Sequence, residues 1–158
     1  MSNLVPSRPP AAREAHHFAI VASLFNGRYV QGLVDHATDE LKSLSPAAAV
    51  SLHQVPGVFE IPIVVRELAL QKRANAILAL GVILQGKTSH AQNLARSVTD
   101  ALQLIALEQG IPVINAVLSL ESEAQARERC LGSKINRGTE AARAAVKIAG
   151  VMRDLRAT

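Results

Sequence analysis

The sequence predicts an α/β protein: a three-layer α/β/α arrangement around a four-stranded parallel sheet, with the strands in a flavodoxin-like order. Short apolar runs alternate along the chain with longer segments whose apolar residues recur at helical spacing. Residues 76–84 read AILALGVIL, an almost continuous apolar run that is typical of a strand buried on both faces of a parallel sheet. The chain has 158 residues, which suits one domain.

Turn residues bound each expected element. The strands are expected at 18–24, 48–55, 76–84 and 113–118. The helices are expected at 28–44, from Pro62 to Lys72 or Arg73, and at 91–109, 122–130 and 139–155. Ser45-Pro46 ends the first helix, and Pro62 suits the first turn of the second. The third helix is expected to be capped by Thr88 or Ser89, and the last near Thr139.

The first 14 residues differ from the rest of the chain. Met1 to Arg13 contains three prolines and two arginines but no apolar segment of a signal peptide, so we expect residues 1–14 to be a mobile arm and residues 15–158 to form the folded domain. No run of about 18 apolar residues occurs, so no membrane partner is expected. The lone cysteine, Cys130, allows no internal disulfide, which favours the cytoplasm, and its expected role is that of a small core residue.

The composition narrows the range of partners. Hydrophobic residues make up 49% of the chain and charged residues only 19%, so we expect part of the apolar surface to be buried between subunits. The net charge is +4, but the basic residues are scattered and only 3% of residues are aromatic, which disfavours a nucleic-acid surface and favours a small anionic substrate. No histidine, cysteine and carboxylate cluster has metal-ligand spacing, so no metal is expected.

Open parallel sheets bind ligands at the carboxyl ends of their strands. Four candidate segments follow the expected strands: Phe25-Asn26, Val58-Phe59-Glu60, Gln85 to His90, and Ser119 to Glu121. The third of these is the richest, because a strand-to-helix turn presents backbone N–H groups and the positive end of a helix dipole to an anion. Lys87 adds a positive charge there, and His90 adds an imidazole that can move protons.

Each candidate also has a simpler structural interpretation. Phe25 could belong to the core or stack on a flat ring at the ligand edge. Glu60 could contact a ligand, but a carboxylate that stabilises a helix start is the favoured interpretation. Arg129 could be a helix-surface charge, yet it precedes a loop that carries Lys134 and Arg137, and a planar guanidinium suits a dianionic phosphate.

The chain has five histidines, and His90 is the candidate acid or base because it alone follows a phosphate-type turn. His16 and His17 are expected to be solvated beside the arm. His36 is expected on a helix face and His53 within a strand. No arrangement of serine, histidine and aspartate typical of a hydrolase triad is recognisable.

Residues 81–88 match the phosphate-loop pattern G-x-x-x-x-G-K-[ST]. A loop of that kind wraps its backbone around phosphates between the two glycines, whereas this segment places Val82-Ile83-Leu84 there, and these residues favour a strand. The next strand, 113–118, also lacks the aspartate that would hold magnesium. We therefore expect the match to be accidental, and a nucleotide hydrolase is the weaker alternative.

Several motifs together resemble one family. They are FN at 25–26, VPGVFEIP at 55–62, LG at 80–81 with GKTSH at 86–90, IPVINAVL at 111–118, and ER at 128–129 followed by NRGTEAA at 136–142. From residue 18 to the last helix, the chain is similar to the 6,7-dimethyl-8-ribityllumazine synthases of riboflavin biosynthesis. The V-P-G-x-F-E-I-P and G-x-T-x-H blocks are specific in combination, whereas either alone would be weak.

The resemblance implies a transferase reaction without a cofactor, in which 5-amino-6-(D-ribitylamino)uracil condenses with 3,4-dihydroxy-2-butanone 4-phosphate and phosphate and water are lost. It implies that His90 is the general acid/base and that Arg129 is the catalytic anchor of the phosphate. The substrate contacts that it implies come from Phe25, Val58, Phe59, Glu60, Val82, Ile83, Leu84, Lys87, Thr88, Asn115 and Arg129. It also implies a homo-oligomer built on pentamers, with sites between subunits to which a neighbour supplies Asn115. Riboflavin synthase is a further candidate partner.

Three positions depart from the pattern common in that family. Gln85 stands where many relatives have Arg, Lys87 where many have a small residue, and Asn115 where many have Phe. We hypothesise that Lys87 supplies the charge lost at Gln85, so that the double change Gln85→Arg with Lys87→Ala would keep phosphate affinity. Gln85 and Asn115 leave open a flavin- or pteridine-binding module without turnover. A shell protein whose assembly is its function is a further alternative.

Overall fold

Four parallel strands form one sheet in the order β2-β1-β3-β4. The computed structural model describes residues 3–158, and its strands are β1 (His17–Ser23), β2 (Ala49–Val55), β3 (Ala76–Leu84) and β4 (Val113–Leu120). In the register, Phe18 of β1 lies opposite Val50 of β2 on one side and Ala76 of β3 on the other. The predicted α/β class, the four-stranded parallel sheet and the flavodoxin-like order are confirmed.

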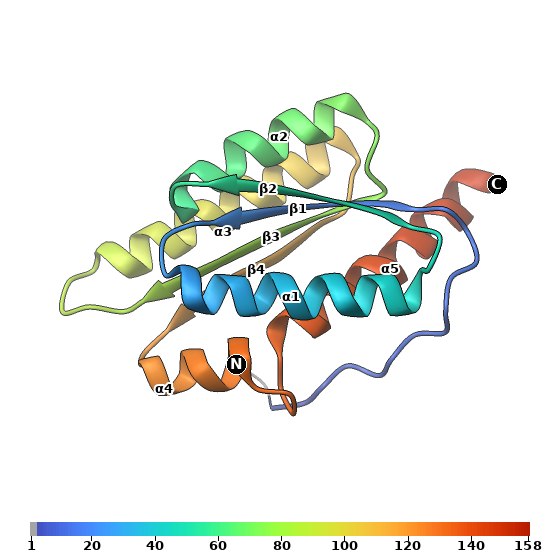
Figure 1. The fold of residues 1–158 in the computed structure, drawn as a ribbon. Coiled ribbons are helices and arrows are strands. Elements are labelled where there is room, and N and C mark those ends of the chain that lie inside the picture. The colour runs from blue at the N-terminus through green and yellow to red at the C-terminus, as the bar shows by residue number, and fades with distance from the viewer. Residues whose placement is uncertain (1–2) are drawn as a thin grey trace.

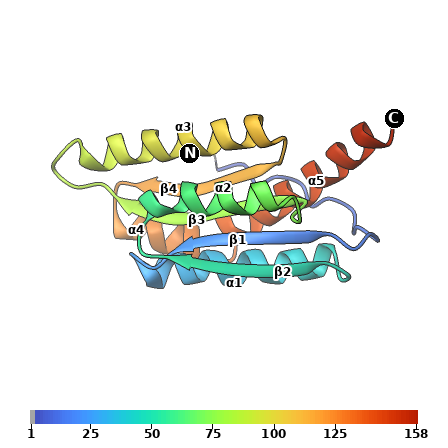
Figure 2. The ribbon, with the colours of Figure 1, turned by 90° about the horizontal axis from the view of Figure 1, so that it is seen from above.

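Helices cover both faces of the sheet. In the described part of the chain they are α1 (Gly27–Leu44), α2 (Ile61–Gln71), α3 (His90–Gln109), α4 (Glu123–Ala126) and α5 (Arg137–Ala157), with a 3₁₀ turn η1 (Val58–Glu60) before α2 and a π-helical turn η2 (Arg127–Leu131) after α4. α2 and α3 lie on one face and α1 and α5 on the other (Figure 1, and from above in Figure 2). None of these described helices is long and apolar enough to cross a membrane.

The two central strands carry a hydrophobic core on each face, because successive strand residues point to opposite sides. Ile20 and Leu78 pack with α1 and α5, whereas Ile77 and Ala79 pack with α2 and α3. Every residue of β3 is buried except Leu84, which is half-buried, as the continuous apolar run predicts. Burial on both faces fixes these strands, so the turns at their carboxyl ends stand on a rigid support.

β4 is longer than predicted. It continues to Leu120, two residues beyond the expected end, because Ser119 and Leu120 pair with Ile83 and Leu84 of β3. Ser119 therefore belongs to the strand rather than to the loop after it, and this places its side chain at the edge where ligands bind.

The last helix begins earlier than predicted, and the prediction of a cap near Thr139 is wrong. α5 starts at Arg137, and the residue before it, Asn136, is the cap. The Asn136 side chain accepts hydrogen bonds from the N–H groups of Gly138 and Thr139. Asparagine is among the strongest N-cap residues because its side-chain oxygen satisfies these first N–H groups.

The polar helix predicted at 122–130 is broken into two short pieces. α4 spans only four residues, and the chain then widens into η2, in which the N–H of Gly132 donates to the carbonyl oxygen of Arg127 at 3.0 Å. A bond across five residues defines a π-helical turn, and such turns often mark functional sites. Arg129 lies in this turn and is buried, so the interpretation of Arg129 as a helix-surface charge is wrong.

The prediction that His16 is solvated is also wrong. The side chain of His16 is 6% exposed, and its ring centroid lies 5.6 Å from that of Phe18. The carbonyl oxygen of His16 accepts a hydrogen bond from the N–H of Ala49 at 2.8 Å. The backbone of His16 is therefore already hydrogen-bonded to β2 one residue before β1 begins, and its imidazole is buried with the sheet.

Gly138 lies in the first turn of α5, where this helix packs on α1. A Cβ atom at residue 138 would lie 2.2 Å from the carbonyl oxygen of Leu33. We predict that Gly138→Ala lowers the free energy of unfolding by about 1–3 kcal/mol, because a backbone oxygen cannot move aside as a side chain can. A Cβ at Gly150 of the same helix meets nothing within 4 Å. Gly150→Ala should therefore be neutral or stabilising by up to about 1 kcal/mol. Equal denaturant midpoints for the two variants would contradict the prediction.

Residues 3–16 run from beside η2, where Asn3 contacts Arg129, past Arg143 and Arg153 of α5 to the start of β1, without forming a helix or strand (Figure 1). Arg8 and Arg143 both donate from Nε to the same carboxylate oxygen of Glu40, at 3.1 and 2.8 Å, and Arg143 Nη1 donates to the carbonyl oxygen of Pro6 at 3.0 Å. These contacts attach the arm to the seam between α1 and α5. The mobility of residues 1–14 stays a prediction, and residues 1 and 2 lie outside the described residues.

The Glu40 contacts make this attachment depend on pH. Burial by itself raises the pKa of Glu40, but hydrogen bonds from Arg143 and Arg8 outweigh burial, so the pKa lies below its ordinary value of 4.5. A carboxyl with a lower pKa in the folded state contributes stability that is present above the unfolded pKa and is lost as the pH falls through the folded one. We predict that below about pH 4.5 the wild type loses thermal stability more steeply than Glu40→Gln. Parallel pH profiles of the melting temperature would contradict this.

Candidate functional site

The turns that follow the four strands meet at one edge of the sheet. The N–H of Phe25, after β1, donates to the carbonyl oxygen of Pro56, after β2, at 3.1 Å. The N–H of Gln85, after β3, donates to the carbonyl oxygen of Leu120, at the end of β4, at 2.8 Å. Backbone hydrogen bonds therefore join the four turns in two pairs, at the edge where open parallel sheets bind ligands.

Asn26 connects these two pairs. Its backbone is left-handed, with a φ of 57°, which asparagine tolerates better than most residues. Its side-chain Nδ2 donates to the carbonyl oxygen of Val82 in β3 at 2.7 Å. The turn fixed in this way presents Phe25, whose side chain is 71% exposed. Phe25 is therefore not a core residue, and it lies exposed on the turn after β1, at the carboxyl edge of the sheet.

The turn after β2 contains three of the predicted contacts. Val58 is buried against β3, where a Cβ at Gly81 would lie only 2.6 Å from Val58 Cγ1. Phe59 is 67% exposed. The Glu60 carboxylate accepts a hydrogen bond from the N–H of Gly57 at 2.9 Å. The structural role favoured for Glu60 is therefore present, and of these three side chains that of Phe59 is the most exposed.

The strand conformation of residues 82–84 excludes a phosphate-binding loop at the end of β3. Val82 and Ile83 are buried strand residues and Leu84 is half-buried, so the segment between the two glycines of the pattern lies in the sheet. A strand cannot wrap its backbone around a phosphate as that loop does. The side chains of Val82 and Ile83 belong to the core, which leaves their backbone groups as the possible ligand contacts.

The turn between β3 and α3 presents the predicted proton carrier. Lys87, Thr88 and His90 are all exposed, and His90 is the first residue of α3. Ser89 stands at the N-cap position, as predicted, but its side chain makes no capping hydrogen bond. In Figure 1 the turn projects beyond the sheet and away from α4.

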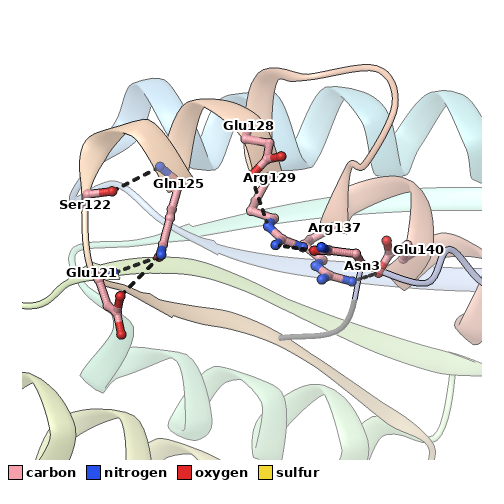
Figure 3. Close-up of polar contacts among 8 residues, drawn as sticks. All are labelled: Asn3, Glu121, Ser122, Gln125, Glu128, Arg129, Arg137 and Glu140. Carbon is pink, nitrogen blue, oxygen red and sulfur yellow. Dashed lines mark hydrogen bonds and ion pairs between the residues drawn. The ribbon is translucent and has the colours of Figure 1, made fainter.

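A polar hollow lies at the ends of β3 and β4. It has a volume of about 220 Å³ and is lined by Gln85, Ser119, Glu121, Gln125 and Arg129. Gln85 Nε2 donates to Ser119 Oγ at 3.2 Å, and the Gln125 side chain bonds to Glu121 through both its oxygen and its nitrogen (Figure 3). The hollow is therefore built from amide, hydroxyl and guanidinium groups, which can donate hydrogen bonds to an anion, and from the Glu121 carboxylate, which only accepts them and is engaged by Gln125.

Arg129 is the cationic wall of this hollow and is only 9% exposed. Its Nη2 donates to the side-chain oxygen of Asn3 at 3.0 Å, and its Nε lies 3.6 Å from a carboxylate oxygen of Glu128. Figure 3 shows the guanidinium of Arg137 beside the same Asn3, and Arg137 is itself paired with Glu140. Two arginines from different elements therefore converge here. A phosphate oxygen at Arg129 would compete with the neutral amide oxygen of Asn3.

Asn115 lies on the outer strand β4 and its amide is already engaged. Its Nδ2 donates to Thr99 Oγ1 at 3.0 Å, and its Oδ1 accepts from the N–H of Val117 at 3.0 Å. Asn115 also borders a second hollow of about 340 Å³, which includes Arg137 and Glu140. This hollow runs along the edge of β4.

Within one chain, the predicted site residues therefore fall into two groups. Gln85 and Arg129 share the polar hollow, and Asn115 lies along the β4 edge. The second group lies on the turns. Phe25 and Phe59 lie on the turns after β1 and β2, and Lys87, Thr88 and His90 lie on the projecting turn after β3. None of these five residues lines either hollow. In residues 3–158, neither of these two hollows encloses all the predicted residues.

Several residues of this region were not predicted from the sequence. Gln125, which lines the hollow, has no sequence signal that separates it from other polar helix residues. Glu140 follows Arg137 at the three-residue spacing that brings helical side chains together, so that pair could have been predicted. Asn136 could have been found as a cap, because it directly precedes the basic and alanine-rich segment that forms α5.

Comparison with known proteins decides the family. A sequence model of the 6,7-dimethyl-8-ribityllumazine synthases matches residues 15–153. The chain belongs to this family. The 6,7-dimethyl-8-ribityllumazine synthase of Halorhodospira halophila is 38% identical over 141 residues, which cover 89% of this chain and 90% of that protein. The synthases of Gloeobacter violaceus and Xanthomonas oryzae pv. oryzae are 39% and 36% identical, over 88% and 92% of this chain and 79% and 92% of their own lengths.

Membership of the lumazine synthase family identifies this chain as a transferase of riboflavin biosynthesis. The resemblance inferred from the V-P-G-x-F-E-I-P and G-x-T-x-H blocks is confirmed. The match spans both groups of site residues, from Phe25 on the turn after β1 to Arg137 at the start of α5.

Proposed function

We propose that this lumazine synthase condenses 5-amino-6-(D-ribitylamino)uracil with 3,4-dihydroxy-2-butanone 4-phosphate to give 6,7-dimethyl-8-ribityllumazine, with release of phosphate and water. The observation that carries the proposal is the buried guanidinium of Arg129, which lines a polar hollow at the ligand-binding edge of the sheet. A rigid cation in such a place suits the phosphate of one substrate and holds it in line as it departs.

In the proposed phosphate site, Arg129 of one chain supplies the main charge and the N-terminus of α3 of a neighbouring copy supplies backbone N–H groups. Lys87 and Thr88 precede that helix and are exposed, so they are able to contact the anion from the turn. Gln85, in the hollow with Arg129, adds a neutral amide. A fixed anion site of this kind lowers the barrier by orienting the two reactants, which can be worth several kcal/mol.

His90 is the proposed proton carrier. The primary amine of the uracil attacks the ketone carbon, and water leaves as the imine forms. Phosphate then departs and leaves an enol, which becomes a ketone by proton transfer. The second amine attacks this ketone and closes the ring, with loss of a second water. Protons are removed from nitrogen and carbon and delivered to the departing oxygen atoms, which is the ordinary work of a histidine side chain. The exposed position of His90 at the start of α3 gives it access to a substrate bound at the turn.

The uracil ring is proposed to lie against Phe25, whose exposed ring offers a flat apolar face. Phe59 is exposed on the next turn and would border the same substrate. Val58, Glu60, Val82, Ile83 and Leu84 would complete the uracil and ribityl pocket, with the buried members contributing backbone groups.

We further propose that the active protein is a homo-oligomer built on pentamers, with each site completed by a neighbouring copy. The division of the site residues into two groups supports this, because Arg129 and Asn115 of one chain could meet the aromatic and histidine turns of the next. An apolar groove of about 330 Å³ between α2 and α3 also includes Phe59, Ile63 and Val98, and Ile63 is 64% exposed. Exposed apolar surface of this kind marks subunit contacts.

We predict that Ile63→Glu lowers the assembly state and the activity together, because it places a charge in the proposed contact and leaves each site incomplete. Sedimentation velocity would measure the change in mass. Val151→Glu on α5 is the matched control, since Val151 is also an exposed apolar helix residue but lies outside this groove. An unchanged mass for Ile63→Glu would exclude α2–α3 as the subunit contact.

The reaction itself is tested by mixing the purified chain with both substrates and following lumazine fluorescence and phosphate release. Fluorescent product and phosphate in equal amounts, without added magnesium or nucleotide, would support the proposal. Tight binding of a flavin or pteridine without turnover would favour the binding-module alternative instead.

The proposed location is the cytoplasm, and riboflavin synthase is the proposed partner.

Cys130 is not part of the proposed chemistry. Burial raises the pKa of the Cys130 thiol to about 12, so this lone cysteine is not a nucleophile at neutral pH.

A further inference from the structure

Asn136 occupies a buried position between η2 and α5 and is 3% exposed. Its amide does more than cap a helix. Nδ2 donates to the carbonyl oxygens of Cys130 at 2.9 Å and Gly132 at 3.0 Å, while Oδ1 accepts from the N–H groups of Gly138 at 2.9 Å and Thr139 at 3.4 Å. An asparagine amide has two N–H donors and an oxygen with two lone pairs, so all four hydrogen-bonding positions are used.

The two donated bonds satisfy the end of η2. A helical turn leaves its last carbonyl groups without partners from a following turn, and a buried carbonyl without a partner is costly. The chain after η2 is an irregular loop, so the carbonyl groups of Cys130 and Gly132 cannot be paired by a continuing helix. Asn136 reaches back across that loop and pairs both, which holds the π-helical turn closed.

The opposite side of η2 is held by α1. A Cβ at Gly32 would lie 2.4 Å from the carbonyl oxygen of Cys130 and 2.6 Å from Leu131 Cδ2, so the two backbones are in close contact. The carbonyl of Cys130 is therefore confined between Gly32 on one side and Asn136 on the other. Arg129 is the residue immediately before this confined point, and its side chain extends towards Asn3 and Arg137 (Figure 3).

We propose that Asn136 is a positioning residue for the anion site: its two N–H donors fix the backbone of η2, and this directs the guanidinium of Arg129 at the bound phosphate. The inference rests on the proposed function, which gives Arg129 the phosphate. The same amide holds the first turn of α5, which carries Arg137, so one side chain sets the relative position of both arginines. A displacement of about 1 Å at such a site can cost on the order of 100-fold in rate.

Two substitutions separate the donors of Asn136 from its role as a cap. Asn136→Ser keeps a hydroxyl that caps α5 but cannot reach both carbonyl groups of η2, whereas Asn136→Ala loses the cap as well. The probe is inorganic phosphate, whose affinity is measured by calorimetry and by its inhibition of the reaction. The KM for the butanone phosphate is measured alongside. We expect both variants to weaken phosphate binding by about tenfold or more with a smaller change in kcat, while Ser is the more stable of the two on thermal unfolding.

If Asn136 were only a helix cap, Asn136→Ser would restore phosphate affinity as well as stability, and that result would overturn the proposal. Asn136→Thr, whose hydroxyl also caps a helix and which adds no charge, is the second variant should Ser fail to fold, and it is expected to bind phosphate poorly. Asn75→Ser is the matched control, because the Asn75 side chain bonds the N–H of His17 at 2.7 Å at the opposite end of the sheet. It should leave phosphate binding unchanged.

Arg129→Gln separates failure of this inference from failure of the proposed function. If Arg129→Gln leaves phosphate binding unchanged, the phosphate site itself is misplaced. If Arg129→Gln abolishes binding and Asn136→Ser does not, the role of Asn136 alone is wrong. The double variant should bind phosphate no more weakly than Arg129→Gln, because Asn136 acts through Arg129. A further independent loss in the double variant would contradict that route.

Discussion

Replacing Arg129 with glutamine should raise the KM for 3,4-dihydroxy-2-butanone 4-phosphate by about 100-fold or more. Hydrogen bonds from a charged donor are each worth about 1.5–3 kcal/mol, and every 1.4 kcal/mol is a factor of ten in affinity. The Arg129 side chain is 11% exposed, so it is shielded from the water that weakens surface ion pairs. Glutamine keeps much of the side-chain volume and one N–H donor group, which limits the change to the loss of charge and of the planar fork.

The measurement is a set of initial rates at varied butanone phosphate and saturating uracil substrate, beside the affinity for inorganic phosphate. Lys134→Gln is the matched control, because it removes one positive charge from an exposed loop that does not line the hollow. If both variants raise the KM equally, the effect is one of overall charge. An unchanged KM for Arg129→Gln would exclude this hollow as the phosphate site.

His90→Ala should lower kcat by about 10²–10⁴ and change the KM much less, because general acid/base catalysis contributes in that range. The substituted residue is exposed at the start of α3, so its loss leaves the core intact and the melting temperature should stay close to that of the wild type. The loss of rate would then reflect missing chemistry rather than unfolding.

Single-turnover fluorescence measures this effect, since it separates the chemical steps from product release. His36→Ala is the control, a half-buried histidine on α1 that lines neither hollow. Partial recovery of the rate by added imidazole in His90→Ala, and none in the wild type, would support a proton-transfer role. A kcat within a few-fold of the wild type would exclude His90 as the main proton carrier.

Local sequence patterns were sufficient to predict much of the fold. The continuous apolar run at 76–84 requires burial on both sides, and the alternation of strands and amphipathic helices requires crossovers that cover both faces of the sheet. Once the strands are parallel, their carboxyl ends share one edge. The positions of Phe25, Phe59, Gln85 and His90 at that edge therefore follow from the order of the elements.

The boundaries and burial states that were mispredicted depend on distant partners. Ser119 belongs to β4 because β3 is long enough to pair with it. His16 is buried because its backbone pairs with Ala49 of the edge strand β2. Arg129 resembles any arginine on a polar helix until α1 and α5 enclose the turn that carries it. Such contacts join residues far apart in the chain, and no local pattern records them.

The sequence by itself determined the parallel α/β fold, the family and the edge of the sheet where the chemistry is proposed to occur, because periodicity and motif spacing are local properties of the chain. The tertiary structure decided which polar residues lie together: the hollow of Arg129 with Gln85, the fourfold engagement of Asn136, and the separation of His90 from Arg129 into different groups. The physical reason is that packing between elements, rather than propensity within them, sets where a side chain points.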